Sequence, residues 1–410
     1  MKILQINNYA YLKGGSEKVF LDTISLLRQK GHEVRSFSVE DDKSKTAQDR
    51  TLVKISTWDS RKGFTSQLKG VADFIYNKRV EKELERLVMS FRPDVAHLHI
   101  YYGRLSNAVV RVLSRYGIPI VQTVHEYRLL CPAYTCLDNN YQTCELCAAE
   151  YFKYSCIRKK CLKSSRLLSI VGSIECFFRD LFFNNQRNFA AFIMVSKFIK
   201  EIHCKSFPEI SSRCFQLYNS VDLSLYSKFR VTTKESYLLY VGRLSYEKGI
   251  FTLIEAMKDI PYDLKIAGTG PLFEKLQRKI KRENISNIEL KGYVVGEELF
   301  HLIAHAKYVI IPSEWYENNP LSIIESFALG TPVIGSNIGG IPELVIDGRT
   351  GFISLPRNSV NLASVISSAL RVTNEKYNVL VEECISFSKE HFSSENYYNA
   401  LMDIYKFVTK

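Results

Sequence analysis

Two glutamates, Glu317 and Glu325, are separated by seven residues in the segment E-N-N-P-L-S-I-I-E. Pro320 lies between them, and its missing N–H and fixed φ suit the first turn of a helix. Free N–H groups at the start of a helix can hold a phosphate. The two carboxylates could therefore bind different hydroxyl-bearing parts of one ligand whose phosphates lie between them. The alternative is a solvated loop that is followed by an ordinary glutamate on a helix surface.

Two cations follow another expected strand. The segment that begins at Tyr237 predicts a strand that ends at Gly242 and a helix that begins near Glu247. Arg243 and Lys248 flank the turn between the two elements. Cations at the start of a helix are well placed to bind a diphosphate.

Glycines and a histidine stand at the carboxyl ends of further expected strands. Gly14 and Gly15 lie between the first strand and its helix, which suggests backbone that approaches a ligand closely, although tight turns also need glycine. Gly268 closes another strand–helix turn. His125 lies at the end of the strand expected at 119–126, where it either contacts substrate or serves as a structural residue.

Six of the ten cysteines fall between residues 131 and 161. Four of them form two closely spaced pairs, Cys144-x2-Cys147 and Cys156-x4-Cys161. Four thiolates at such spacing match a tetrahedral structural zinc site, although the gap between the pairs is shorter than in common zinc ribbons. Free thiols in an inserted subdomain are the alternative, and Cys131 or Cys136 could replace one of the four ligands.

The stretch from Tyr151 to Ile174 is basic and contains no acidic residue. Its six cations are Lys153, Arg158, Lys159, Lys160, Lys163 and Arg166. An apolar helix begins within this stretch, and a basic cluster joined to such a helix can lie on an anionic membrane surface, here the cytoplasmic face of the inner membrane. The alternative is a helix that packs on a sheet and leaves its lysines solvated.

Alternating strands and helices position these residues. Around Glu317 the pattern predicts, in order, a strand at Tyr308–Ile311, a helix at Ser322–Leu329 ended by Gly330, and a strand at Thr331–Ser336. Such a unit belongs to a parallel sheet, and its loop lies at the carboxyl edge, where α/β folds bind ligands. Similar alternation starts with a strand at Lys2–Asn7 and continues in both halves of the chain.

The length of 410 residues is too great for one typical core. We expect one Rossmann-like domain over residues 1–216, with a cysteine-rich basic insert at 131–166, and a second over 217–390. A C-terminal helix is expected over 391–410. A ligand site is expected in the cleft between two such domains.

Composition limits the class of protein. Hydrophobic residues make up 46% and charged residues 24% of the chain, as in ordinary soluble globular proteins. No apolar run approaches the length of a membrane span, and M-K-I-L-Q-I-N reads as a first strand, so we expect a cytoplasmic location. The net charge of +12 indicates an anionic partner, which could be nucleic acid, phospholipid or a phosphorylated small molecule.

Together these segments resemble the retaining sugar-nucleotide glycosyltransferases of family 4. The resemblance runs nearly end to end. Its carriers are K-G-G-S-E-K-V-F, the strand-end H-E, N-S-V-D, G-R-L-S-Y-E-K-G, and E-N-N-P-L-S-I-I-E followed by A-L-G-T-P-V-I-G-S-N-I-G-G-I-P-E. It implies an α/β fold of the GT-B type, in which two Rossmann-like domains with parallel sheets face each other across a cleft. It also implies that the C-terminal helix crosses back to the first domain.

The resemblance implies roles for the residues that match the family motifs. Arg243 and Lys248 would bind the donor diphosphate. Glu317 would contact hydroxyls of the donor sugar, and Glu325 would hold the ribose hydroxyls. The implied catalytic set is Glu317, His125, Arg243 and Lys248, with His125 near the transferred sugar. The implied donor-binding set is Gly14, Gly15, Gly242, Arg243, Lys248, Gly268, Glu317, Asn318, Asn319, Pro320, Leu321 and Glu325.

The implied reaction transfers a hexose from a UDP- or GDP-linked sugar to a glycan or lipid-linked acceptor in the synthesis of a bacterial surface polysaccharide. The chain contains no D-x-D triplet, the usual metal–diphosphate handle of the other glycosyltransferase fold, so we expect catalysis without a cofactor. Fixed cations and helix N–H groups would stabilise the departing nucleoside diphosphate instead. E-N-N-P replaces the commoner E-G-F-G of the family, which leaves the identity of the donor sugar open.

Two other functions fit parts of the same pattern. A GT-B-fold sugar-nucleotide epimerase would also use a nucleotide cleft and contacts to hexose hydroxyls. A zinc-containing nucleic-acid-binding protein would use the cysteine cluster and the net charge. Its lysines would need aromatic or base-reading partners on one face, and the basic stretch shows no such array, so we expect no nucleic-acid partner.

Overall fold

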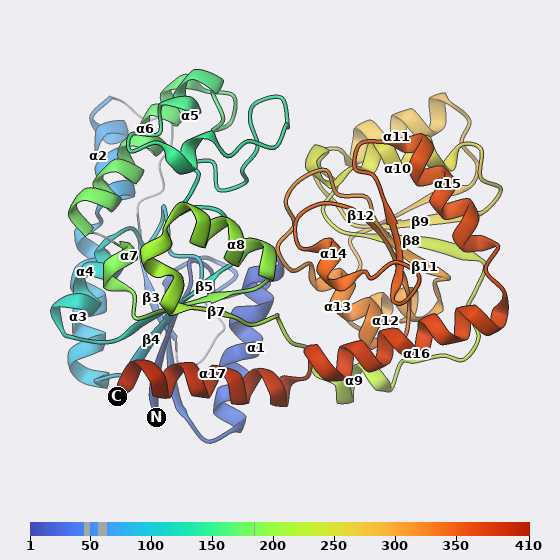
Figure 1. Ribbon diagram of the computed structural model, residues 1–410. Coiled ribbons are helices and arrows are strands. Elements are labelled where there is room, and N and C mark those ends of the chain that lie inside the picture. Colours follow the sequence, from blue (N-terminus) through green and yellow to red (C-terminus); the bar gives the residue numbers. More distant parts are fainter. Residues whose placement is uncertain (45–49, 56–63, 184) are drawn as a thin grey trace. The chain divides into compact units, whose positions relative to one another are not determined.

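The computed structural model describes residues 1–44, 50–55, 64–183 and 185–410 (Figure 1). The chain divides into two compact units, each with its own parallel sheet. Unit 1 contains Met1–Leu217 and Tyr398–Lys410, and unit 2 contains Tyr218–Tyr397. Among the described residues, no helix combines the length and the apolar character needed to cross a membrane.

Unit 1 has a seven-stranded sheet in the order β3-β2-β1-β4-β5-β6-β7. Its strands, which pair in parallel, are β1 (Lys2–Ile6), β2 (Glu33–Val39), β3 (Arg50–Val53), β4 (Val95–Leu98), β5 (Ile120–Val124), β6 (Ala191–Met194) and β7 (Cys214–Gln216). β4, β5 and β6 are buried along their whole length, as expected for strands that helices cover on both faces. The strand order changes direction between β1 and β4, and open α/β sheets bind ligands beyond the carboxyl ends at such a switch point.

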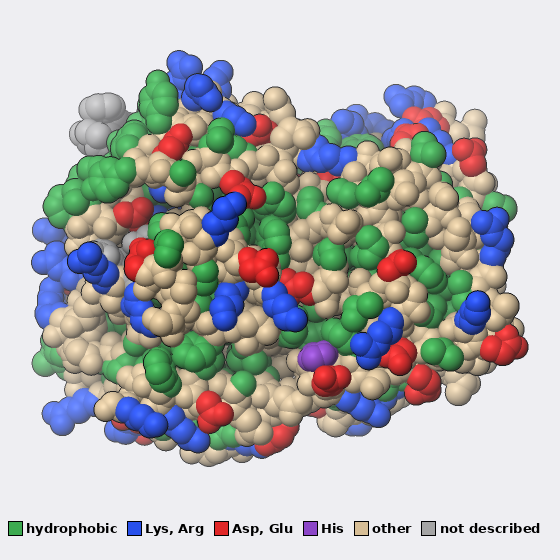
Figure 2. Space-filling view, in the orientation of Figure 1, with side chains coloured by type: hydrophobic (Ala, Val, Ile, Leu, Met, Phe, Trp, Pro, Cys, Tyr) green, Lys and Arg blue, Asp and Glu red, His purple; other side chains and the backbone are tan. Residues whose placement is uncertain are grey.

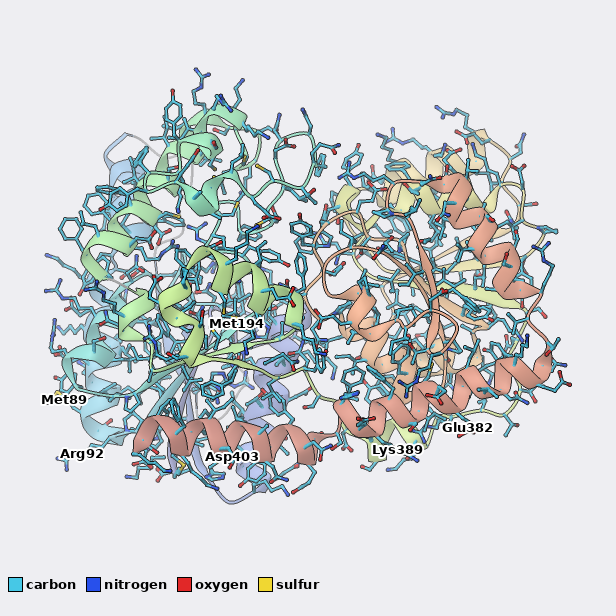
Figure 3. All side chains as sticks on the ribbon, viewed as in Figure 1. Met89, Arg92, Met194, Glu382, Lys389 and Asp403 are labelled. Atoms are coloured by element: carbon cyan, nitrogen blue, oxygen red, sulfur yellow. The ribbon has the colours of Figure 1, made fainter. Side chains whose placement is uncertain are left out.

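The helices of unit 1 lie on both sides of this sheet (Figure 1). They are α1 (Gly15–Gln29), α2 (Phe64–Ile75), α3 (Lys78–Phe91), α4 (Ala108–Arg115), α5 (Tyr154–Lys159), α6 (Arg166–Phe178), α7 (Asn185–Asn188) and α8 (Lys197–Ser206). Helix α17 (Ser394–Thr409) begins in unit 2, and its part from Tyr398 onward belongs to unit 1. That part buries Leu401 and Tyr405, whereas Asp403, which is labelled in Figure 3, is exposed.

Unit 2 has a six-stranded sheet in the order β10-β9-β8-β11-β12-β13. Its strands, also parallel, are β8 (Tyr237–Val241), β9 (Asp263–Ala267), β10 (Ile288–Gly292), β11 (Tyr308–Ile311), β12 (Val333–Ser336) and β13 (Gly351–Ser354). The order changes direction between β8 and β11. The loops that follow these two strands therefore meet at the switch point of the sheet.

The helices of unit 2 are α9 (Leu223–Ser227), α10 (Ile250–Met257), α11 (Phe273–Arg282), α12 (Gly296–His305), α13 (Leu321–Ala328), α14 (Ile341–Leu344), α15 (Ser359–Leu370) and α16 (Asn374–His391). A short 3-10 turn covers Tyr246–Lys248. Successive residues of each central strand face two separate cores: Leu239 and Val309 lie in one, and Leu238 and Tyr308 lie in the other. Charged side chains gather on the outside of each unit (Figure 2).

The prediction of an α/β fold with two Rossmann-like parallel sheets is confirmed. Two local predictions need correction. Pro320 is not in the first turn of α13 but precedes it with an extended backbone (ψ 119°), so the helix begins at Leu321. The α-helix predicted to begin near Glu247 begins at Ile250, because Gly249 adopts a left-handed conformation (φ 68°) that separates the 3-10 turn from α10.

Candidate functional site

Glu317 is a buried carboxylate in the loop between β11 and α13. Its Oε1 accepts hydrogen bonds from Lys248 Nζ at 2.5 Å and from Ser313 Oγ at 2.7 Å. Burial alone would raise the pKa of Glu317, but the Lys248 ammonium and these hydrogen bonds outweigh it, so the pKa lies below its ordinary value. The residue is therefore a fixed negative charge at neutral pH.

Lys248 reaches Glu317 because the loops after β8 and β11 meet at the switch point. Its ammonium lies 4.9 Å from the centre of the Trp315 ring, within cation–π range. The next residue, Gly249, leaves no room for a side chain, since a Cβ there would lie 1.8 Å from the Pro312 carbonyl oxygen. Glycine thus allows the two loops to touch.

A third loop supports Glu317 from the end of β12. Gly340 N donates to the Glu317 carbonyl oxygen at 2.6 Å. Gly339 has φ 61°, and a Cβ there would lie 2.4 Å from the same oxygen. The backbone of Glu317 is consequently fixed by one loop and its carboxylate by another.

Glu325 is the second buried carboxylate, one turn inside α13. Its Oε1 accepts a hydrogen bond of 2.8 Å from the hydroxyl of Tyr226, a buried residue of α9. Glu317 and Glu325 therefore have different supports. A cation holds the first, and a phenol orients the second.

Asn319 joins the same loop to the segment that opens unit 2. Its Oδ1 accepts from Asn219 N at 2.8 Å, and its carbonyl oxygen accepts from Asn219 Nδ2 at 3.3 Å. Its buried Nδ2 has no hydrogen-bond partner among the described residues, which leaves this group available to a ligand. Asn318, Pro320 and Leu321 are its neighbours, all partly buried.

The remaining predicted residues of unit 2 lie at strand ends on the same edge of the sheet. Gly242 follows β8 and Gly268 follows β9, and Gly242 N donates to the Ala267 carbonyl at 3.1 Å. Arg243 is exposed, and within the described part of the chain its side chain makes no hydrogen bond or ion pair. The structure thus unites Lys248 with Glu317 but does not bring Arg243 to them.

In unit 1, Gly14 and Gly15 lie at the start of α1, beyond the carboxyl end of β1. Gly14 is the residue before the helix, its backbone is extended, and it has no side chain with which to cap the first turn. A Cβ on Gly14 would lie 3.4 Å from Glu17 Oε2. Burial, together with the charge of Glu17 and against that of Arg128, raises the pKa of Glu126 to about 7.

His125 follows β5 and is held by a second histidine. His125 Nε2 lies 2.9 Å from His99 Nδ1, and the two rings stack. His99 Nε2 in turn lies 3.1 Å from Gln5 Oε1. Burial lowers the pKa of His125 to about 4 and the pKa of His99 well below its ordinary value, so both rings are neutral at pH 7.

The same amide joins a third histidine and α17 to this cluster. Gln5 Nε2 donates to the Tyr405 hydroxyl at 3.2 Å and lies 3.3 Å from His97 Nδ1. His97 Nδ1 also lies 2.7 Å from the Tyr405 hydroxyl, and its Nε2 lies 2.7 Å from Thr123 Oγ1. A continuous hydrogen-bonded network therefore runs inside unit 1 from α17 to His125.

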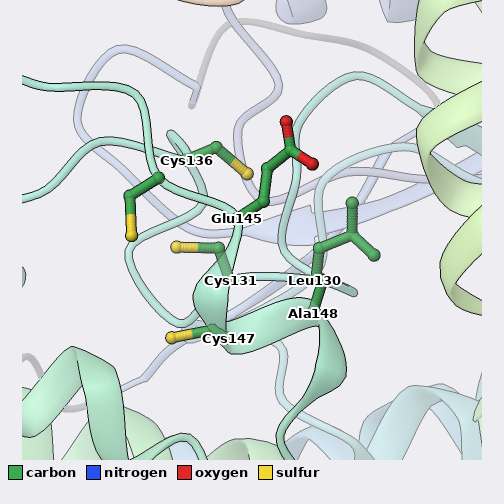
Figure 4. A pocket seen from close by; sticks show the side chains of 7 residues that line it. Leu130, Cys131, Cys136, Glu145, Cys147 and Ala148 are labelled. Carbon is green, nitrogen blue, oxygen red and sulfur yellow. The ribbon is translucent and has the colours of Figure 1, made fainter.

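The cysteines of the insert group differently from the prediction. Cys131, Cys136, Cys144 and Cys147 line one small pocket (Figure 4). Cys156 and Cys161 lie beside each other, and Cys161 N donates to the Cys156 carbonyl oxygen at 3.1 Å. A hydrogen bond with the Cys136 thiol lowers the pKa of Cys131 to about 7. Among the described residues, no group of three or more His, Cys, Asp or Glu side chains is placed to hold a metal ion. Zinc binding by Cys144, Cys147, Cys156 and Cys161 therefore stays a prediction.

Two family models match the chain. The model for Glycosyltransferase Family 4 matches residues 13–225, more than half of the chain, and the model for Glycosyl transferases group 1 matches residues 226–384. The chain belongs to glycosyltransferase family 4. The predicted family is therefore confirmed.

Relatives of this family 4 glycosyltransferase include two uncharacterized proteins. It is 30% identical over 215 residues to a glycosyltransferase of Methanocaldococcus jannaschii, a match that covers 52% of this chain and 58% of the relative. The chain is also 24% identical over 358 residues to an uncharacterized 42.6 kDa protein in the cps region of Klebsiella pneumoniae. This match covers 84% of the chain and 87% of the relative.

Solved structures share its fold. Sucrose-phosphate synthase from Thermosynechococcus elongatus matches with a TM-score of 0.73 and 18% identity, over 99% of this chain and 98% of that chain. Anabaena HepE in complex with UDP matches with a TM-score of 0.70 and 18% identity, over 98% and 99%. The GT-B fold that the resemblance implies is confirmed.

Several residues of the site in this family 4 glycosyltransferase were not predicted from the sequence. Ser313, Tyr226 and Asn219 each hold one of the predicted residues in place. Asn219 lies in N-S-V-D, a motif already noted, so it could have been found. Tyr226 has no signal of its own, since its partner Glu325 lies 99 residues away.

Proposed function

We propose that the chain transfers a hexose from a UDP- or GDP-linked sugar to a glycan or lipid-linked acceptor, with retention of configuration and without a metal cofactor. One observation carries this proposal. An ionised, buried carboxylate is clamped to a cation at the switch point of unit 2, and a second buried carboxylate lies on the adjoining helix. Glycosyl transfer itself follows from the family.

The proposed chemistry uses each of these groups. Lys248 would bind the donor diphosphate, and sugar hydroxyls would donate hydrogen bonds to the Glu317 carboxylate that Lys248 now holds. Glu325 would accept hydrogen bonds from the ribose hydroxyls. As the bond to the sugar breaks, negative charge grows on the leaving nucleoside diphosphate. The fixed Lys248 ammonium and the N–H groups at the start of α13 stabilise that charge without reorganising. Arg243, which is exposed in this structure, would have to turn toward the diphosphate to add its charge.

The other predicted contacts belong to the same proposal. His125 would lie near the transferred sugar, and Gly14 and Gly15 would present backbone to the phosphates. UDP is bound by Anabaena HepE, which has the same fold, and the Klebsiella relative is encoded in a cps region. Both support a nucleotide-sugar donor and a role in making a surface polysaccharide.

A donor screen tests the proposal. The protein is incubated with a panel of UDP- and GDP-sugars, with and without EDTA, and release of the nucleoside diphosphate is measured. We expect one donor class to be consumed, at a rate that EDTA does not change. Consumption of none of the donors would contradict the proposal, and so would stoichiometric interconversion of the sugar, which would indicate an epimerase. The anomeric configuration of the product, read by NMR, tests retention.

A further inference from the structure

An unbroken line of aromatic rings lies on the surface of unit 1. The rings of Tyr151 and Phe152 both contact Phe177, at centroid distances of 5.5 and 5.9 Å. Phe177 contacts Phe178 at 5.9 Å, and Phe178 stacks on Phe182 at 5.3 Å. The line therefore starts ahead of α5 and follows the second half of α6 into the turn beyond it.

The rings of this line are exposed to solvent, except for Phe177, which is partly buried. Tyr151 is 65% exposed and Phe182 63%, and the neighbouring Leu167 and Leu181 are 61% and 47% exposed. Figure 2 shows hydrophobic side chains gathered over this part of unit 1. Single exposed apolar residues are ordinary, but a contiguous apolar surface marks a binding site.

Four cations lie on α5 and on the segment that leads from it into α6. Arg158, Lys160, Lys163 and Arg166 are exposed, and in the described part of the chain none of them forms an ion pair. The other two cations of the stretch have structural roles. Lys153 is buried and donates to the carbonyls of Cys147 and Glu150, and Lys159 pairs with Asp138 at 3.0 Å.

The opposite face of α6 is firmly anchored. Glu175 is buried and pairs with Arg128 at 2.7 Å, and burial of Arg179 places a second guanidinium 3.9 Å from it. Gly172 packs against Leu162, where a Cβ would lie 2.3 Å from a methyl carbon. The helix is therefore a fixed support whose outer side carries apolar rings.

We propose that this aromatic–basic surface, formed by Tyr151, Phe152, Arg158, Lys160, Lys163, Arg166, Leu167, Phe177, Phe178, Leu181 and Phe182, binds an anionic lipid bilayer. Aromatic and leucine side chains enter the headgroup region, and the cations contact anionic headgroups. The positive charge of the four exposed cations argues against a cationic partner. The lack of any acidic residue from 151 to 174 favours an anionic one. Binding of the bilayer does not depend on the proposed function. The further idea that it brings the enzyme to a lipid-linked acceptor does rest on the proposed function.

Vesicle sedimentation tests this proposal on the full chain. The probes are vesicles of phosphatidylcholine alone and of phosphatidylcholine mixed with phosphatidylglycerol. We expect at least about tenfold stronger binding to the anionic vesicles, lost at high salt, because each cation near the surface adds to the attraction. Equal binding to both vesicles, or binding to neither, overturns the proposal.

Two surface variants and a control locate the binding. The triple variant Phe178→Ser, Leu181→Ser, Phe182→Ser and the variant Lys160→Glu, Lys163→Glu should each lose at least about tenfold in binding. The control Val360→Ser, Val379→Ser removes exposed apolar side chains of unit 2 (79% and 60% exposed) and should bind like wild type. Binding of the surface variants to vesicles as strong as that of wild type overturns the proposal. So does a wild-type protein that does not bind vesicles but self-associates, when the triple variant is monomeric. Donor consumption by the surface variants should match wild type, so failure of docking and failure of the proposed function give different results.

A separate inference concerns the histidine network of unit 1. Gln5 Nε2 donates to Tyr405, so its Oε1 is the atom that faces His99 Nε2. A carbonyl oxygen can only accept, so His99 carries its proton on Nε2, and its Nδ1 must accept. The proton between His99 and His125 therefore belongs to His125 Nε2.

We infer that Gln5 and His99 are positioning residues that hold His125 as the neutral tautomer with its proton on Nε2. In general, the hydrogen bond made by one ring nitrogen of a histidine decides whether the other ring nitrogen carries a proton. Its value for contact with the sugar rests on the proposed function. The tautomer itself can be measured without substrate.

Protein labelled with 15N in histidine gives ring-nitrogen spectra that distinguish the tautomers, with His125 assigned from the signals lost in His125→Asn. We expect His125 in the single Nε2–H form in wild type. The variant Gln5→Leu removes the acceptor of His99 and should give His125 a mixture of tautomers. Thr123→Val removes only the partner of His97 and should leave the His125 signals unchanged. A wild-type Nδ1–H form, or an unchanged tautomer in Gln5→Leu, overturns the inference.

Discussion

The two buried carboxylates of unit 2 differ in what holds them. Glu317 is paired with Lys248, so its orientation depends on charge, whereas Glu325 is oriented by the Tyr226 hydroxyl. Removing each support should therefore have a distinct effect. Loss of the Tyr226 hydroxyl leaves the charge of Glu325 in place but frees its side chain.

We expect Tyr226→Phe to weaken binding of the donor nucleotide about fivefold, because a hydrogen bond to a buried carboxylate contributes about 1 kcal/mol or more. Calorimetric titration with UDP and GDP measures this effect. The control is Tyr237→Phe, which removes a buried hydroxyl that donates to the Leu302 carbonyl in the same unit. Equal nucleotide affinity in wild type and Tyr226→Phe would contradict the assignment of Glu325 to the ribose site.

Glu126 gives a pH-dependent prediction at the same scale. Its pKa is raised to about 7 in the folded chain and lies near 4.3 in the unfolded chain. The folded state therefore binds more protons between these values, so stability falls as the pH rises from about 4.3 to 7. Glu126→Gln lacks this loss, so its free energy of unfolding relative to wild type should rise by about 1–3 kcal/mol between pH 4 and pH 8. Thermal melts at both pH values measure the difference, and a difference that does not change with pH would contradict the prediction.

Among the elements, the loop after β12 has a defined mechanical role, since it contacts the backbone of Glu317. Gly339→Ala adds a Cβ 2.4 Å from a carbonyl oxygen at φ 61°. Gly348→Ala, at φ 71°, adds one that has no described atom within 4 Å apart from those of its own residue and its chain neighbours. We expect a loss of about 1 kcal/mol in stability for Gly348→Ala, from backbone conformation alone. Gly339→Ala should lose about 1–3 kcal/mol more and should also weaken donor binding. Equal melting temperatures of the two variants would show that the contact with Glu317 is unimportant.

The cysteine insert gives a prediction about metal binding. Its thiols group as Cys131, Cys136, Cys144 and Cys147 around one pocket, with Cys156 beside Cys161. The predicted zinc remains a prediction, and metal analysis of the purified protein tests it. About one zinc per chain in wild type and none in Cys147→Ser would support the predicted zinc site. Zinc binding would then require the thiols to move closer together. A folded protein without metal would contradict it.

Elements that local chemistry specifies could be predicted from the sequence, whereas those that depend on distant contacts could not. The β-branched run at Tyr308–Ile311 and the positive φ of Gly330 were predicted because each is a property of adjacent residues. The 3-10 turn before Gly249 was missed, because that glycine lies against the backbone of Pro312, a residue of a distant loop. Lys153 was counted with the surface cations because its burial depends on the fold of the insert. The network around Gln5 joins residues as much as 400 positions apart, so no local pattern shows it.

At the scale of the whole molecule, two parallel sheets with their own cores carry different groups. Unit 2 holds the carboxylates and Lys248, and unit 1 holds the histidine network and the aromatic–basic surface. The alternation of strands and helices and the family motifs predicted both sheets. The aromatic line could not be predicted, because only packing decides which face of α6 is buried.

The central claim is that Glu317 binds the sugar of a nucleoside diphosphate donor. The most direct test is release of nucleoside diphosphate from the donor that wild type consumes, compared among wild type, Glu317→Gln and Glu314→Gln. Glu314 lies in the same loop, but its carboxylate contacts Thr252 and Arg357. We expect Glu317→Gln to lower turnover about 100-fold or more with an unchanged fold, because it removes a charged contact to the sugar. Glu314→Gln should stay within about threefold of wild type. Turnover of Glu317→Gln close to that of Glu314→Gln would contradict the account.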